Sequence, residues 1–141
     1  QEVWDKTMAV NVTANWRLIR SLDPLLRASD AGRAIFVSSG AATKCLAYWG
    51  VYSVSKAALE ALVRTYAAET VSTPVRAMLL NPGPLRTAMR RAAMPGEDPA
   101  TLKTPEDLAP AFVRLASPDW TETGKLYDFP QGRLLAHRAP L

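Results

Sequence analysis

The sequence of 141 residues predicts an α/β fold in which a parallel sheet is flanked by helices. Segments with helical periodicity alternate with short apolar runs, and turn residues separate them. Their order is helix, strand, helix, strand, helix, strand, and parallel neighbouring strands need crossover connections of this kind. The length suits one compact domain, so we expect residues 1–141 to form a single unit.

The first four predicted elements span residues 3–80. Apolar residues recur at three- and four-residue steps over 3–26, which predicts a long amphipathic helix. Continuous apolar runs at 33–38 and 75–80 predict strands that are buried on both faces. The segment 51–70 between them is rich in Ala, Leu and Glu and therefore predicts a second long helix.

The last third of the chain contains one further helix and one short strand. Thr104-Pro-Glu-Asp supplies an N-cap residue, a proline at the first helical position and early acids, so we expect a helix over 105–116. Pro110 removes one helical hydrogen bond and should bend that helix. Residues 125–129 predict a strand, and 130–141 carry no strong pattern. The proline- and charge-rich residues 85–103 predict a mobile segment.

Composition limits the class of protein. There is no apolar run long enough to cross a bilayer and no leader-like pattern at the start, so we expect a soluble, cytoplasmic protein that does not contact membranes. Cys45 and His137 are the single cysteine and histidine, which excludes an internal disulfide and leaves no cluster suited to zinc. We therefore expect no metal site.

The net charge of +4 comes partly from three arginines after a Pro-Gly turn, Arg86, Arg90 and Arg91. Such a cluster could attract an anionic ligand or nucleic acid, or it could be a solvated loop face. No basic stripe with interleaved aromatic residues accompanies it, so we favour the solvated face and expect no nucleic-acid partner.

The most informative pattern is a tyrosine and a lysine at the start of the second helix. Tyr52 and Lys56 lie four residues apart and so share one helix face, where the ammonium group lies near the phenol and favours its ionised form. Ser39 precedes Tyr52 by thirteen positions and ends the first predicted strand, and the turn after Asn81 ends the second. Ligands of parallel sheets bind beyond these carboxyl ends.

Each of these features also has an ordinary structural explanation. A Tyr-x-x-x-Lys pair is often a surface tyrosine beside a solvated lysine, and a Ser-Ser or Pro-Gly pair is often only a turn. Their joint spacing favours catalysis, because Asn11, Ser39, Tyr52 and Lys56 are followed by Asn81-Pro-Gly-x-x-x-Thr87 in one order.

These motifs resemble, in their usual order, those of the short-chain dehydrogenase/reductase family, and the similarity runs over nearly the whole chain. The resemblance implies a Rossmann-type fold and hydride transfer between NAD or NADP and a carbonyl or secondary alcohol. Tyr52 would be the general acid and base, and Ser39 would hold the substrate oxygen. Lys56 would lower the tyrosine pKa and hold the nicotinamide ribose, and Asn11 would kink its helix and hold a water near Lys56.

The resemblance also implies a cofactor site and partners. Besides Tyr52 and Lys56, the residues that would contact the cofactor belong to the turn after the second strand: Pro82, Gly83, Leu85 and Thr87. Residues 85–103 would form a substrate lid. The two long helices would pair copies of the protein into a homodimer or homotetramer. The segments Thr87-Ala-Met-Arg and Gly124-Lys-Leu-Tyr-Asp-Phe look most like the YciK-like branch of bacterial oxidoreductases.

The chain departs from the family by beginning where the family's middle begins. Its seven glycines are scattered, and no glycine-rich phosphate loop or first βαβ unit is present. We therefore expect this polypeptide to be the carboxyl-terminal part of the doubly wound fold, a fragment that by itself binds dinucleotide poorly and is inactive. The alternative is a half-length, non-catalytic interaction module that retains the association helices.

Overall fold

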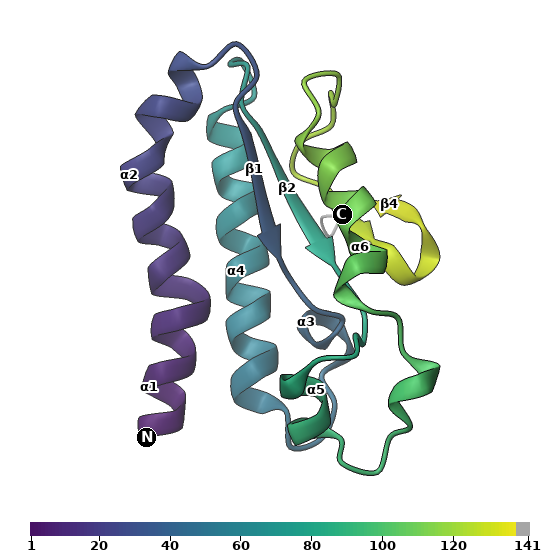
Figure 1. Ribbon diagram of the computed structural model, residues 1–141. Helices are drawn as coiled ribbons and strands as arrows, with labels where there is room; N and C mark the ends of the chain where they lie inside the picture. Colours follow the sequence, from purple (N-terminus) through teal and green to yellow (C-terminus); the bar gives the residue numbers. More distant parts are fainter. Residues whose placement is uncertain (138–141) are drawn as a thin grey trace.

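The computed structural model describes residues 1–137, and these form an α/β unit around one four-stranded sheet (Figure 1). The strands lie in the order in which they follow in the chain: β1 (Arg33–Val37), β2 (Arg76–Asn81), β3 (Leu126–Asp128) and β4 (Arg133–Leu135). β1 pairs with β2 and β2 with β3 in parallel, as predicted. β4 pairs with β3 in the antiparallel direction.

Helices connect the strands and cover both faces of the sheet. A long helix at the start of the chain consists of three consecutive parts, α1 (Glu2–Met8), the π-helical η1 (Ala9–Thr13) and α2 (Ala14–Ala28). The remaining helical elements are α3 (Ala41–Lys44), α4 (Gly50–Glu69), α5 (Ala88–Ala93), η2 (Pro99–Thr101), α6 (Pro105–Ala116) and η3 (Phe129–Gln131).

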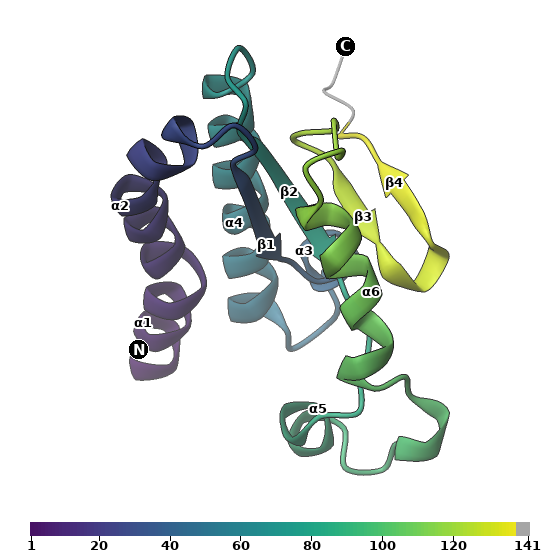
Figure 2. The ribbon, with the colours of Figure 1, turned by 45° about the horizontal axis from the view of Figure 1, so that its top comes forward.

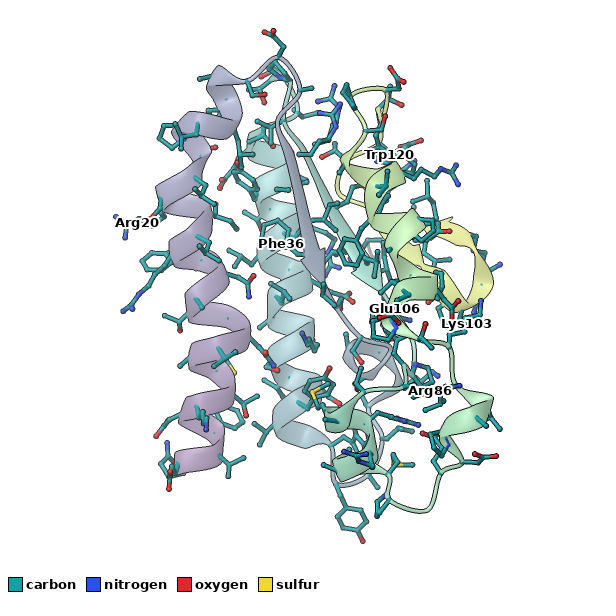
Figure 3. The ribbon with its side chains drawn as sticks, in the orientation of Figure 1. Arg20, Phe36, Arg86, Lys103, Glu106 and Trp120 are labelled. Carbon is teal, nitrogen blue, oxygen red and sulfur yellow. The ribbon has the colours of Figure 1, made fainter. Side chains whose placement is uncertain are left out.

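The two faces of β2 pack against different helices because successive side chains of a strand point to opposite sides. Ala77 and Leu79 belong to a core that they share with α4, and Phe36 of β1 also packs there (Figure 3). Met78 and Leu80 belong to a second core with α6. Figure 2 shows α2 and α4 on one side of the strands and α6 on the other. The strand is thus buried on both faces, as its continuous apolar run predicts.

The predicted helix over 105–116 is confirmed, including its start. The Thr104 hydroxyl accepts the Asp107 backbone N–H, and the Asp107 carboxylate accepts the Thr104 backbone N–H, which makes a capping box. Pro105 stands in the first turn, where its missing N–H costs nothing. Pro110 lies inside the helix, which nevertheless continues to Ala116.

Within residues 130–137 the structure contains a strand that the sequence, which has no strong pattern there, does not predict. A left-handed Gly132, with φ of 63°, turns the chain after η3, and Arg133–Leu135 pairs with β3 as β4. A strand of three residues has too little sequence to show alternation, so only its pairing defines it. Residues 138–141 lie outside the described part of the chain. The short helices α3 and α5 were likewise not predicted.

β1 forms one edge of the sheet, and its side chains stay partly exposed whereas most of β2 is buried. The long first helix also presents large apolar side chains to solvent; Val3, Val10, Leu18 and Leu25 are each more than half exposed. Within residues 1–137 no helix is both long enough and apolar enough to cross a membrane.

Candidate active site

The predicted site residues gather where the parallel strands end. The carboxyl ends of β1 and β2 point toward α3, α5 and the first turn of α4 (Figure 1). Ser39 follows β1, Tyr52 is the third residue of α4, and the Pro82-Gly83 turn follows β2. This is the edge at which α/β sheets bind ligands.

Lys56 links the tyrosine to the strand end. Its Nζ donates a hydrogen bond to the backbone oxygen of Val37 at 2.9 Å and lies 5.7 Å from the ring centroid of Tyr52. Burial lowers the pKa of the Lys56 ammonium, because desolvation disfavours the charged form. The Trp49 ring meets Tyr52 edge-on at 5.9 Å between centroids. The phenol ring therefore has both an aromatic ring and a half-buried cation close to it.

Asn11 reaches the same helix from the other side. Its Nδ2 donates to the Ser55 hydroxyl at 3.0 Å, and that hydroxyl donates to the Tyr52 backbone oxygen at 2.8 Å. Ser55 is fully buried. Asn11 lies within the π-helical η1, a local widening that is frequent at functional sites. Its side chain thus contacts the backbone of the tyrosine's turn through Ser55.

The two adjacent serines after β1 have different surroundings. Ser38 is buried and donates to the Glu60 carboxylate at 2.6 Å, and Arg64 binds the other carboxylate oxygen at 3.2 Å. Ser39 is half-buried, and its hydroxyl accepts only the Ala41 backbone N–H, at 3.2 Å. No hydrogen bond joins the Ser39 and Tyr52 hydroxyls in residues 1–137. Ser38 thus ties the strand end to α4, and Ser39 keeps a hydroxyl proton for another acceptor.

The residues of the turn after β2 separate into two groups. Gly83 adopts a left-handed φ of 68°, which explains the need for glycine after Pro82. Thr87 caps α5 by accepting the Arg90 backbone N–H at 3.1 Å. Leu85 packs against the α6 core and bridges to Lys103. Pro82 and Gly83 thus lie at the strand end. Thr87 is the N-cap of the next helix, and the Leu85 side chain packs against the core beside α6.

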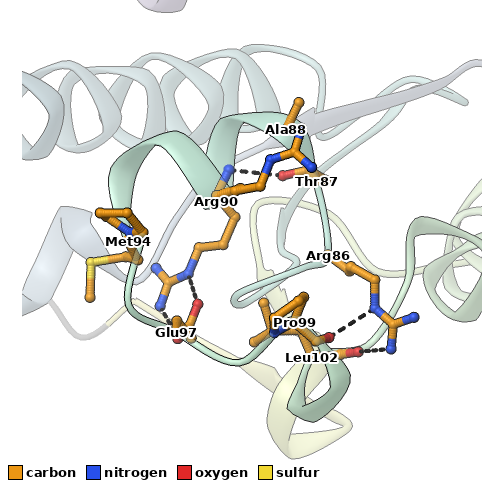
Figure 4. A pocket seen from close by; sticks show the side chains of 10 residues that line it. Arg86, Thr87, Ala88, Arg90, Met94, Glu97, Pro99 and Leu102 are labelled. Carbon is orange, nitrogen blue, oxygen red and sulfur yellow. Dashed lines mark hydrogen bonds and ion pairs between the residues drawn. The ribbon is translucent and has the colours of Figure 1, made fainter.

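Two of the three clustered arginines are bound within their own segment. Arg90 forms two hydrogen bonds of 2.6 Å with the Glu97 carboxylate, and Arg86 donates to the backbone oxygens of Pro99 and Leu102 (Figure 4). These contacts join α5 to η2 around a cavity of about 400 Å³. Tyr52 and Ser39 do not line it, so the arginines shape this segment instead of forming an open basic face.

Asn81 and Asp128 connect the strand ends; sequence reasoning named Asn81 only as the start of the turn motif and missed Asp128. The Asn81 Oδ1 accepts the backbone N–H groups of Gly40 and Gly83, each at 3.1 Å, and its Nδ2 donates to Asp128 at 2.6 Å. A usable signal was present, because both are polar residues at the carboxyl end of a parallel strand.

Comparison with known proteins identifies the family of this chain. A family profile described as short chain dehydrogenase matches residues 1–98. The chain belongs to the short-chain dehydrogenase/reductase family. Its fold is therefore of the Rossmann type that the resemblance implied.

The relatives come from the predicted branch of this family. The uncharacterized oxidoreductase YciK of Escherichia coli K12 is 42% identical over 133 residues, which cover 94% of this chain and 52% of that protein. A short chain dehydrogenase from Salmonella enterica serovar Typhi superposes with a TM-score of 0.88 at 40% identity, over 91% of this chain and 53% of the other. A similar structure from E. coli CFT073, complexed with NADPH, gives 0.86 at 41% identity over the same shares. The chain spans about half the length of these relatives.

Proposed function

We propose that this chain supplies the catalytic half of an NAD(P)-dependent oxidoreductase that interconverts a carbonyl and a secondary alcohol. The observation that carries the proposal is the position of the Lys56 ammonium, between the Tyr52 ring and the strand end that precedes Ser39. Relatives of the same fold were solved with NADPH and with NADP, which supports a nicotinamide cofactor.

The donor groups fit a nicotinamide nucleotide. The Lys56 ammonium has three N–H donors. One donates to the Val37 oxygen, and the other two have no acceptor within residues 1–137. The remaining donors suit ribose hydroxyls. The Pro82-Gly83 turn and Thr87 would contact the nicotinamide amide, and Leu85, whose side chain packs against the α6 core, would do so through its backbone. When bound, the cofactor supplies or takes up the hydride.

The side chains of this chain handle the proton. In the reductive direction, Tyr52 gives its hydroxyl proton to the substrate oxygen as hydride reaches the carbonyl carbon, and the resulting phenolate is stabilised by Lys56. The Ser39 hydroxyl donates to the same oxygen while negative charge develops on it. Asn11 acts through Ser55 by fixing the turn that carries Tyr52, and it would also hold a water near Lys56. Oxidation reverses these steps.

The cavity between α5 and η2 supports a lid role for residues 85–103. The Arg90–Glu97 and Arg86 contacts make this segment a braced unit that follows the cofactor turn directly. Such a unit would close over a substrate as a rigid segment and keep its internal hydrogen bonds.

The exposed apolar residues of the first helix support self-association. Val10, Leu18 and Leu25 stand on solvent-facing positions of the long helix beside α4. Several large apolar side chains exposed on one helix are a feature of protein interfaces. We therefore propose a homodimer or homotetramer that pairs through α1–α2 and α4.

The proposal is tested by binding and turnover in the protein expressed from its complete reading frame. NADPH and NADH binding by fluorescence should be measurable, with oxidation of one of them in the presence of a carbonyl substrate. Lys56→Ala should weaken nucleotide binding and lower kcat by about 10²-fold or more. Lys125→Ala is the control and should change neither, because this partly exposed lysine precedes β3, at the opposite end of the strand from the site.

Absence of binding to both nucleotides would overturn the oxidoreductase proposal and leave only an association role for these helices. Normal nucleotide affinity in the Lys56 variant would remove the ribose role assigned to that residue.

A further inference from the structure

One amide side chain joins the two loops that flank the site. Asn81 ends β2, and its Oδ1 accepts two backbone N–H groups, one from Gly40 and one from Gly83, each at 3.1 Å. Gly40 directly follows Ser39, and Gly83 belongs to the proposed nicotinamide turn. A single oxygen atom therefore fixes the distance between the loop that carries the serine and the loop that meets the cofactor.

A buried carboxylate fixes the orientation of this amide. Asn81 Nδ2 donates to Asp128 Oδ1 at 2.6 Å, and the two residues are only 9% and 6% exposed. An ionised carboxylate only accepts hydrogen bonds, so the amide nitrogen must face it. The amide oxygen must then face the two glycine N–H groups. Asp128 at the end of β3 thus selects the one amide orientation in which both loops are held.

We infer that Asn81 and Asp128 are positioning residues for hydride transfer, an inference that rests on the proposed function. The pair acts on no reacting atom. It holds the Ser39 loop and the Gly83 turn in one geometry, and displacements of about 1 Å in such a geometry can cost about 10²-fold in rate. Loss of the pair therefore lowers kcat more than it raises the KM for nucleotide.

An exchange of the two groups tests this directly. Asn81→Asp places two carboxylates against each other and removes the donor, whereas Asp128→Asn leaves an amide oxygen that still accepts from Asn81. The double variant Asn81→Asp/Asp128→Asn rebuilds the pair with donor and acceptor reversed, and a carboxylate oxygen again faces Gly40 and Gly83.

Two readouts are needed in the protein from its complete reading frame. Hydrogen exchange at the Gly40 and Gly83 amides reports the hydrogen bonds themselves, and kcat with NADPH reports their consequence. We expect Asn81→Asp to speed both exchange rates and to lower kcat by about 10- to 100-fold. In the double variant, both exchange rates and kcat should return most of the way to the parent values. Asp128→Asn replaces a charge-assisted acceptor by a neutral amide, which can present either its oxygen or its nitrogen and so no longer selects one orientation of Asn81. It should therefore speed both exchange rates measurably and lower kcat by about two- to tenfold, so the test remains decisive if Asn81→Asp does not fold.

The outcomes separate the two proposals. Unchanged exchange and kcat in Asn81→Asp, a folded double variant without recovery, or unchanged kcat in Asp128→Asn would overturn the inference. A parent protein that binds nucleotide with slow exchange at both glycines but transfers no hydride would instead overturn the proposed function, while the exchange data would still confirm the link between the loops.

Discussion

Ser38 and Ser39 are neighbours in sequence, and their alanine variants should have opposite consequences. The Ser38 hydroxyl is buried and donates to the Glu60 carboxylate at 2.6 Å. Ser38→Ala leaves that buried carboxylate with one charge-assisted hydrogen bond fewer, a loss of about 1.5–3 kcal/mol in unfolding free energy. At roughly 3–5 °C per kcal/mol for a protein of this size, Tm should fall by about 5–15 °C.

Ser39→Ala loses only a hydrogen bond from the Ala41 N–H, which is neutral and half-buried, so its cost should be about 0.5–1.5 kcal/mol. Its effect on turnover should be much larger, about 10²–10³-fold in kcat, if Ser39 holds the substrate oxygen. Ser38→Ala should keep kcat within a few-fold where the protein is folded.

Urea unfolding followed by circular dichroism gives the free energies, and NADPH oxidation gives kcat at a temperature where both variants are folded. The reasoning would be refuted if Ser38→Ala were no less stable than Ser39→Ala, or if Ser39→Ala kept full kcat. A loss of kcat shared equally by both variants would also contradict it, because the two hydroxyls would then have one role.

Two further predictions concern the turn and the segment after β2. Gly83→Ala forces a left-handed residue with a Cβ and places that carbon 2.5 Å from Pro130 Cγ, so urea unfolding should show a loss of about 1–2 kcal/mol or more. Gly96→Ala, with no atom within 4 Å, is the control and should be close to neutral; equal losses would contradict the prediction. The hydrogen bonds from Arg90 lower the pKa of the Glu97 carboxyl, so their stabilisation is complete above the ordinary carboxyl pKa of about 4.3 and is lost as pH falls through the lower folded value. Thermal unfolding should therefore separate the parent from Glu97→Gln at pH 7, and the difference should shrink as pH falls below the ordinary carboxyl pKa; a constant difference would refute the assignment.

The sequence predicted those parts of the fold that local signals determine. The helix Pro105–Ala116 was predicted to the residue because its cap, its first-turn proline and its acids are adjacent in the chain. The helix predicted over 51–70 spans Gly50–Glu69 in the structure. Both strands predicted from continuous apolar runs, β1 and β2, are present in the structure. The expected burial on both faces holds for β2 and not for β1, because β1 lies at the edge of the sheet and its side chains stay partly exposed.

What the sequence did not predict depends on contacts between distant residues. β4 exists through its pairing with β3. The apolar periodicity of the first helix does not indicate that residues 9–13 are π-helical. The spacing of Tyr52 and Lys56 indicates a shared helix face, but no spacing relates Asn81 to Asp128, which are 47 residues apart. The candidate catalytic residues were thus visible as motifs, whereas the groups that hold their loops required the structure.

The central claim is that Tyr52 transfers the proton in a nicotinamide-dependent reduction. The most direct test compares Tyr52→Phe with the parent, both expressed from the complete reading frame, in NADPH binding and in turnover of a carbonyl substrate. Phenylalanine keeps the ring that packs against Trp49 and removes only the hydroxyl. The account predicts nucleotide affinity close to that of the parent and turnover lower by about 10²–10⁴-fold. Turnover at the parent rate in the phenylalanine variant would contradict it.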